Sequence, residues 1–254
     1  MKIKLLFQFL SVVVPVLACF SDETPSTSPS LLEEYPLTST KQLPLPHKML
    51  YRAHPWHGPA LGERAPEIVN CYIEMAPVCT LKFEMDKETG ILKVDRPQKY
   101  SSFCPTLYGF LPRTYAGSRI GEYTSLKTGI PGIGGDKDAL DVFVLSDNTF
   151  LNGDILLRAR PIGGFRVLDS NEADDKIIAV LVDDAVFGNI KDLHECPEKV
   201  IDQMRHFLLT YKDLPEKDKK GKIEIHSLYG REEAYEVIRR GYLDYMDYIS
   251  LYQQ

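Results

Sequence analysis

Three aspartates, Asp136, Asp138 and Asp141, lie within six residues of one another, directly ahead of the apolar run 142–145. Carboxylates at this spacing repel one another, and a buried cluster survives only if cations neutralise it. Sites built wholly from carboxylate oxygens favour hard cations such as Mg2+. The cluster is therefore a candidate metal site, and the alternative is a solvated acidic turn ahead of a strand.

The spacing of these aspartates limits how they can meet. On a regular strand Asp136 and Asp138 share a face and Asp141 points the other way, and a helix does not bring the three together either. They converge on one metal only if the chain turns before a strand that begins near Asp141. The glycines at 132–135 make such a turn possible with little strain.

A second acidic group follows at Asp169, Asp174 and Asp175, with Lys176 directly after it. Taken alone, this segment is typical of a polar hairpin loop. Together with the first cluster, two acidic loops at the mouth of one barrel offer places for several metals. A predicted helix that ends near 211–213 brings a phenol and an ammonium towards the same mouth.

The composition limits the class of protein. The chain has 254 residues, 44% of them hydrophobic and 26% charged, which is ordinary for a globular protein with one substantial core. Its net charge of −6 argues against a general nucleic-acid binder, which is normally basic. The sequence also lacks the aromatic and basic stripe of a barrel that binds single strands, so no nucleic-acid partner is expected.

The first 19 residues are typical of a secretion signal. Lys2 and Lys4 precede an almost wholly apolar stretch at 5–17, which is too short to span a bilayer comfortably. It ends in a Val-Leu-Ala-Cys sequence that resembles a bacterial lipoprotein processing site and implies lipid on Cys19. We expect export and a membrane anchor on the periplasmic or extracellular side. The alternatives are plain secretion, and a cytoplasmic protein whose hydrophobic start is not processed.

Three segments are expected along the chain: a signal at 1–19, a tether at 20–65 and a folded domain at 66–254. The tether is rich in Ser, Thr and Pro and offers little core of its own. Its one aromatic knot, at 54–57, is a candidate for docking on the domain. An oxidising compartment would permit disulfides, in any of three connectivities, among Cys71, Cys79, Cys104 and Cys196.

The folded part is predicted to be mainly β, within the α+β class. Many short strands with brief turns indicate a small barrel or sandwich. Apolar residues at helical spacing predict two closing helices, at about 197–211 and 230–249. The Gly-rich segment 115–135 is expected to be a surface loop. The β-type runs are 68–75, 80–85, 91–94, 139–145, 155–162 and 176–182.

Several separated motifs resemble the soluble family I inorganic pyrophosphatases, in the same order and over about 68–249. Residues 136–142 resemble the family's Asp-x-Asp-x-x-Asp signature, and 169–176 keep its Asp-x4-Asp-x-Lys spacing. Any one motif is weak, whereas the ordered set is specific. The other matching segments are 73–75 and 81–86 (early strands), 94–96 (arginine segment), 107–110 (Asn-Tyr-Gly segment), 206–207 and 211–214 (late helix).

The resemblance implies a five-stranded OB-like closed β-barrel with flanking C-terminal helices, and a homo-oligomer. It also implies hydrolysis of inorganic pyrophosphate to two orthophosphates, with several Mg2+ ions at each site. By position, the implied metal ligands are Asp136, Asp141, Asp169 and Asp174. The implied phosphate binders are Lys82, Arg96, Tyr108, Lys176, Tyr211 and Lys212. The implied general base is Asp138, and the implied supporting carboxylates are Glu74 and Glu84.

These residue types suit attack of water on a compact polyanion. Metals lower the pKa of water, a carboxylate accepts the remaining proton, and Lys and Arg neutralise the phosphate oxygens. The sequence departs from the family at Ala139, Cys104 and Leu107, where Pro, Tyr and Asn are usual. The alternative function is a non-catalytic lipoprotein that binds metal or phosphate on the same scaffold.

Overall fold

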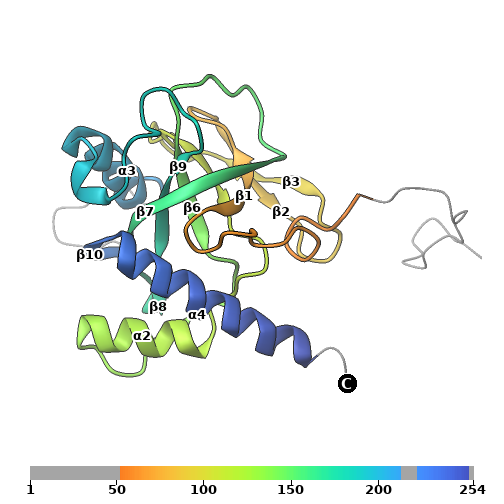
Figure 1. Ribbon diagram of the computed structural model, residues 1–254, viewed down its shortest axis with the longest axis vertical. Coiled ribbons are helices and arrows are strands. Elements are labelled where there is room, and N and C mark those ends of the chain that lie inside the picture. The colour runs from red at the N-terminus through yellow and green to blue at the C-terminus, as the bar shows by residue number, and fades with distance from the viewer. Residues whose placement is uncertain (1–51, 213–221, 252–254) are drawn as a thin grey trace, which may run out of the picture. The chain divides into compact units, whose positions relative to one another are not determined.

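The computed structural model describes residues 52–212 and 222–251 (Figure 1). The expected signal peptide, the lipidation site and most of the expected tether therefore lie outside the described residues. No helix of the described part is long and apolar enough to cross a membrane. In chain order the elements are β1 (Val69–Met75), β2 (Leu81–Met85), β3 (Leu92–Pro97), β4 (Leu107–Phe110), α2 (Ser118–Thr128), β5 (Gly134–Gly135), β6 (Asp141–Leu145), β7 (Ile155–Asp169), β8 (Glu172–Ala173), β9 (Lys176–Leu181), the 3-10 helix η1 (Leu193–Glu195), α3 (Glu198–Thr210), β10 (Ile223–Gly230) and α4 (Arg231–Ser250).

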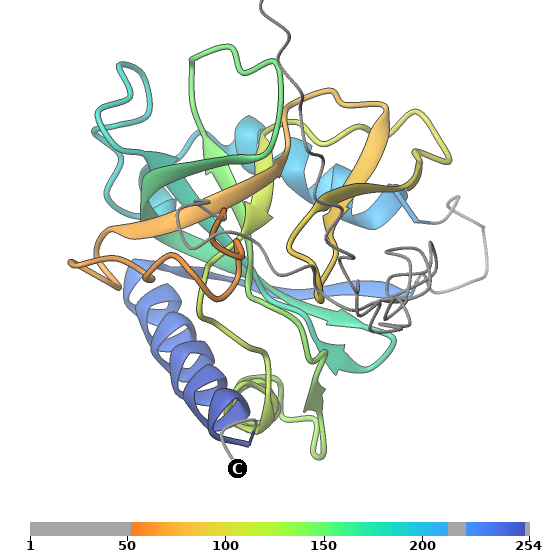
Figure 2. The same cartoon turned by 90° about the vertical axis from the view of Figure 1, so that its right-hand side faces the viewer.

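Five strands pair into a closed ring, which confirms the predicted five-stranded barrel. The ring runs β1–β4–β6–β9–β7 and returns to β1. The β6–β9 pair is parallel and the other four pairs are antiparallel. The hairpin of β2 and β3 forms a separate sheet beside the ring (Figure 2). Closure leaves none of the five ring strands with an open edge.

Strand β7 is much longer than the run predicted from the sequence. It pairs with β1 over 155–159 and with β9 over 159–165. It pairs with β10 over 163–169 and with β8 at its last two residues. The register shifts between Pro161 and Gly163, where proline cannot donate a ladder hydrogen bond. This extension past the barrel carries Asp169 to the far end of the strand.

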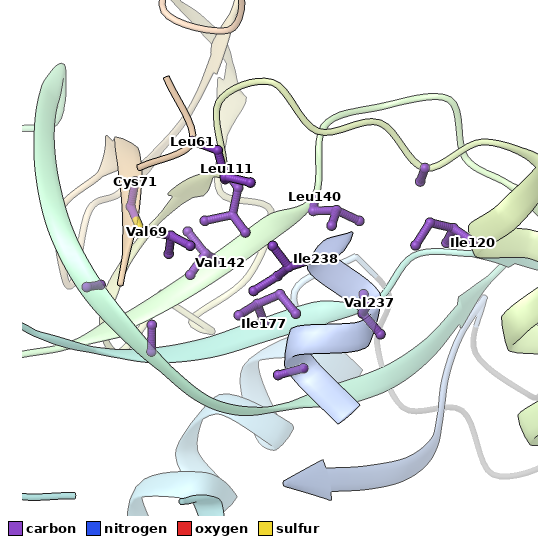
Figure 3. Packing of buried hydrophobic residues seen from close by; sticks show 14 of the residues in the cluster. Leu61, Val69, Cys71, Leu111, Ile120, Leu140, Val142, Ile177, Val237 and Ile238 are labelled. Atoms are coloured by element: carbon purple, nitrogen blue, oxygen red, sulfur yellow. The ribbon is translucent and has the colours of Figure 1, made fainter. Parts of the chain in front are cut away.

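The core has three clusters of buried residues, and β6 separates the two larger ones. Val142 and Val144 face the barrel interior, whereas Phe143 and Leu145 face a second cluster that includes Phe207 of α3. This burial on both faces explains why residues 142–145 are continuously apolar rather than alternating. Helix α4 covers the barrel interior, with Val237 and Ile238 beside Val69, Leu111, Leu140, Val142 and Ile177 (Figure 3).

The prediction of a surface loop over 115–135 is wrong, because residues 118–128 form α2. The side chain of Asp244, on α4, accepts the backbone N–H groups of Gly117, Arg119 and Ile120 at 2.9 to 3.1 Å. This carboxylate caps the helix start from a distant element, and no side chain of the helix's own N-cap residue does so. A local sequence pattern could not reveal that cap.

The folded part begins earlier than the predicted boundary at residue 65. Trp56 is 2% exposed, and its indole Nε1 donates to the carbonyl of Thr114 at 2.8 Å. Leu61 packs into the barrel core. The expected docking of the 54–57 knot is therefore confirmed, and residues 52–65 belong to the domain rather than to the tether.

Candidate active site

One hollow of about 220 Å3 gathers all thirteen residues that the sequence singled out. They come from β1, β2, β3, β4, β6, β9, the end of β7, the turns before β6 and β9, and the segment after α3. The barrel and its hairpin together build the wall. Four further residues complete the lining: Met85, Lys87, Phe110 and Ala139. The thirteen are Glu74, Lys82, Glu84, Arg96, Tyr108, Asp136, Asp138, Asp141, Asp169, Asp174, Lys176, Tyr211 and Lys212.

The first acidic cluster turns as its spacing requires. Lys137 has a φ of 65°, in the left-handed region, and the backbone N–H of Asp138 donates to Oδ1 of Asp136 at 3.1 Å. Strand β6 begins at Asp141. Gly135 is needed because a Cβ there would lie 2.1 Å from the carbonyl oxygen of Ala116. The turn therefore occurs one residue beyond Asp136. Gly135 does not make the turn but allows the chain to pack closely against Ala116.

Asp138, the predicted general base, is held by two partners. Its Oδ1 accepts the backbone N–H of Ala139 at 2.8 Å, and its Oδ2 lies 2.9 Å from Nζ of Lys87. Burial raises the pKa of the Asp138 carboxyl, and the Lys87 ammonium and the Ala139 N–H offset part of that rise. Proline, usual in the related family, has no N–H to donate at position 139.

The Ala139→Pro variant tests this hydrogen bond. Losing the N–H removes a stabiliser of the Asp138 anion, so the pKa of Asp138 is expected to rise by up to about one pH unit. The acid limb of the kcat/KM profile should move to higher pH by that amount. Ala139→Ser, which keeps the N–H, is the control, and equal profiles for the two variants would contradict the assignment.

Lys176 links the two acidic clusters. Its ammonium hydrogen-bonds both Asp141 and Asp174, and Asp141 also accepts the Tyr108 hydroxyl at 2.5 Å. Burial alone would lower the pKa of Lys176, but the charges of Asp141 and Asp174 raise it well above its usual range. The lysine side chain is 3% exposed, so it neutralises two carboxylates inside the protein.

Excess negative charge in the hollow is also relieved by protons. The pKa of Asp136 is raised by burial and by the neighbouring Asp174 carboxylate, to which it hydrogen-bonds. Burial raises the pKa of Glu74 to about 8, although the N–H of Met85 donates to this carboxyl at 2.8 Å. Protons and the Lys176 ammonium thus neutralise carboxylates that divalent cations could neutralise instead. The carboxylates offer only oxygen ligands, which hard cations prefer.

The carboxylates do not form a ready-made metal cage. Within 52–212 and 222–251, no group of three or more Asp, Glu, His or Cys side chains converges closely enough to hold a metal. The reason is visible in the geometry, because the Lys176 ammonium lies between Asp141 and Asp174. The residue types fit hard cations, and a cation held by both Asp141 and Asp174 would have to displace the Lys176 ammonium from them.

The raised pKa of Glu74 predicts a pH-dependent stability. Between its ordinary 4.5 and about 8, the folded protein keeps a proton that the unfolded chain has lost. The free energy of unfolding of the metal-free protein should therefore fall as pH rises, by up to about 1.4 kcal/mol per pH unit from this group. Urea unfolding in EDTA should show a shallower slope for Glu74→Gln, whose amide oxygen still accepts the Met85 N–H. Equal slopes would contradict the assignment.

The remaining cations of the hollow are each paired with a carboxylate. Lys212 hydrogen-bonds Asp169, and Lys82 lies 3.1 Å from carboxylate oxygens of both Glu84 and Asp95. Arg96 also pairs with Asp95. A phosphate anion would compete with these carboxylates for the same donors.

Two functional residues were missed in the sequence. Lys87 contacts Asp138, and Asp95 holds both Lys82 and Arg96. Lys87 lies in the turn between β2 and β3, and Asp95 directly precedes Arg96 on β3. The predicted hairpin was the only indication that these two residues lie near the site. The register that places Lys82 opposite Arg96 could not be read from the sequence.

Two of the three departures from the related family lie in the core. Cys104 is 1% exposed and Leu107 is 1% exposed, and neither lines the hollow. The Cys104 thiol donates to the carbonyl of Thr106. These substitutions therefore leave the wall of the site intact. All four cysteines of the described part are free: Cys71, Cys79, Cys104 and Cys196.

The fold and the hollow define a small closed-barrel protein whose site gathers carboxylates and cations for a polyanion and its counter-cations. A family model described as inorganic pyrophosphatase matches residues 71–246. The chain belongs to this family. The inorganic pyrophosphatase of Chlamydia trachomatis serovar L2 is 57% identical over 196 residues, which cover 76% of this chain and 94% of that protein. Soluble inorganic pyrophosphatase 1 of Arabidopsis thaliana is 35% identical over 197 residues, which cover 78% of this chain and 82% of that protein.

A solved structure agrees with the sequence relatives. The crystal structure of inorganic pyrophosphatase from Thermus thermophilus superimposes with a TM-score of 0.63 at 30% identity. The match covers 76% of this chain and 99% of that one. The barrel described above is thus the fold of the family.

Proposed function

We propose that the protein hydrolyses inorganic pyrophosphate to two orthophosphates. The observation that carries the proposal is the convergence of thirteen separated polar residues in one hollow of a family member. Each role that the sequence predicted has a residue of the required type in this hollow. The departures at Cys104 and Leu107, which had kept a non-catalytic binder open, lie in the core instead.

The chain's own residues would divide the work. Lys82, Arg96 and Lys212 would bind phosphate oxygens after releasing their carboxylate partners, and the Tyr211 hydroxyl would add a donor. Asp138 would accept the proton of the attacking water, since its carboxylate lines the hollow and its raised pKa suits a base. Lys87 would hold that carboxylate in place.

We further propose that Mg2+ is the metal, held by Asp136, Asp141, Asp169 and Asp174. When bound, such cations lower the pKa of water and neutralise charge on the substrate. Glu74 and Glu84 would support the site from β1 and β2, and Glu74 would lose its proton as cations enter. A homo-oligomer, without a nucleic-acid partner, stays our expectation for the assembled protein.

Phosphate release from pyrophosphate tests the function. The wild-type protein is expected to be active with Mg2+ and inactive in EDTA. Asp141→Asn is expected to be at least about 100-fold slower, because it removes a charged oxygen of a proposed metal ligand. Asp147→Asn, an exposed aspartate outside the hollow, is the matched control. Wild-type inactivity across Mg2+, Mn2+, Co2+ and Zn2+ would refute the proposal.

We propose that the protein is exported and anchored through Cys19. The support is the sequence of the first 19 residues alone, with its two lysines, apolar core and Val-Leu-Ala-Cys end. Fractionation of the native protein should place wild type in the membrane fraction and Cys19→Ala among soluble exported or uncleaved forms. Recovery of wild type in the cytoplasm would show that the segment is not a functional signal.

A further inference from the structure

A second hollow, of about 460 Å3, lies between the segment before β1, strand β7 and the start of α4. It shares no lining residue with the candidate active site. Five cations line it: Arg64, Arg160, Lys191, Arg231 and Arg239. Its volume is within the range of small-molecule sites. We call it the basic groove.

The charge of the basic groove is opposite to that of the whole chain. Only two carboxylates, Glu67 and Glu232, line it beside the five cations, which leaves an excess of three positive charges. The chain as a whole carries a net charge of −6. A local positive field of this kind concentrates anions in the hollow.

Two of the cations have no carboxylate partner among the described residues. The Arg160 guanidinium donates to the carbonyl of Gly188 at 2.7 Å, which orients it without neutralising its charge. The Lys191 ammonium makes no ion pair with any described residue. Arg231 pairs only with the exposed Glu232 of its own helix turn, at 3.1 Å. The charges of Arg160 and Lys191 are therefore available to an anionic ligand, which Arg231 would join by exchanging the exposed Glu232 for it.

The fold fixes the backbone positions from which these side chains extend. Arg160 lies in β7, where it pairs with Val180 of β9 in the barrel wall. The N–H of Arg231 donates to Asp192 at 2.9 Å, and the Arg231 guanidinium lies 3.5 Å from the Lys191 carbonyl. The two side chains thus start from adjoining backbone, and a preorganised site binds more tightly than a mobile one.

A more apolar hollow of about 290 Å3 continues from the basic groove. The two share Pro66 and Arg239, and the second is lined further by Leu61, Ile238 and Tyr242. Tyr235, which is 9% exposed, adds an aromatic surface to the basic groove itself. The pair of hollows offers a cationic end and an apolar end to one ligand.

We propose that the basic groove binds a phosphorylated small molecule. Its phosphate groups would contact Arg160, Lys191 and Arg231, and any organic portion would extend over Pro66 towards the apolar hollow. This site is separate from the hydrolytic one and does not depend on pyrophosphate turnover.

Binding of tripolyphosphate and of ATP to the full-length protein in EDTA tests the proposal. Without metals the cations of the active site stay paired with its carboxylates, so the basic groove should dominate. The Lys191→Gln/Arg231→Gln double variant is expected to bind at least about tenfold more weakly than wild type, since two charge-assisted contacts are lost. The matched control, Lys199→Gln/Arg205→Gln on the exposed face of α3, should bind as wild type does. ATP binding more tightly than tripolyphosphate would identify a nucleotide-like ligand, and equal affinities an inorganic one.

Three results would overturn the proposal. The first is equal affinity of the groove variant and its control. The second is loss of binding in Arg96→Gln/Lys212→Gln instead, which would place the anion in the hydrolytic hollow. The third is a change in the number of subunits of the groove variant, measured by sedimentation, which would make the groove a contact between copies. Circular dichroism and an unchanged kcat on pyrophosphate establish that the groove variant is folded.

Discussion

Replacing Asp138 by asparagine is expected to lower kcat for pyrophosphate by about 10²- to 10⁴-fold, the usual contribution of a positioned base. Asparagine is nearly isosteric, and its amide oxygen still accepts the N–H of Ala139. It cannot take a proton from water. Because Asp138 is not among the predicted metal ligands, the affinity for Mg2+ should change little.

Steady-state kinetics and Mg2+ titration of the same preparations measure both quantities. Asp147→Asn is again the matched control, since Asp147 is exposed and outside the hollow. A kcat within about threefold of wild type would show that another group accepts the proton. A large loss of Mg2+ affinity would instead make Asp138 a ligand.

Replacing Lys176 by methionine is expected to destabilise the metal-free protein by about 3–5 kcal/mol, the usual effect of removing one partner of a buried ion pair. The side chain is 3% exposed and is hydrogen-bonded to both Asp141 and Asp174. Its loss leaves two carboxylates without their cation. Divalent cations should then restore stability, because they bind the folded form at those carboxylates.

Urea unfolding in EDTA and in Mg2+ measures this effect. The stabilisation by Mg2+ should be larger for Lys176→Met than for wild type, because no ammonium competes with the metal. Lys199→Met is the control, since that lysine is 92% exposed and its pair with Asp202 is loose at 3.5 Å. Equal stability of Lys176→Met and wild type in EDTA would show that the lysine is dispensable for charge balance.

Much of the site was predictable because its residues keep fixed spacings within short segments. The Asp136–Asp141 turn was required by geometry, and it forms where the spacing demands, with β6 starting at Asp141. The closed barrel and the two C-terminal helices were also expected. The sequence could not show how the segments combine, such as Lys87 reaching Asp138 or Asp95 holding Lys82 and Arg96.

The errors of prediction have one physical origin, which is stabilisation by distant parts of the chain. Helix α2 has a glycine at its N-cap and few apolar residues, and it is capped by Asp244 from α4. Trp56 lies within the predicted tether, and although docking of its aromatic knot was expected, the partners that bury it, Thr114 and Tyr245 of α4, are distant in the chain. Local propensity and hydrophobic spacing carry no information on either contact.

The most direct test of the hydrolytic site is pyrophosphate hydrolysis in water enriched in oxygen-18, analysed by mass spectrometry of the released phosphate. With Mg2+ the wild-type protein should consume pyrophosphate and release two phosphates per molecule, with one solvent oxygen incorporated for each pyrophosphate cleaved. Asp138→Asn should give the same labelling at a strongly reduced rate. Intact pyrophosphate after prolonged incubation with Mg2+, or phosphate without solvent oxygen, would contradict hydrolysis by a water molecule that Asp138 deprotonates.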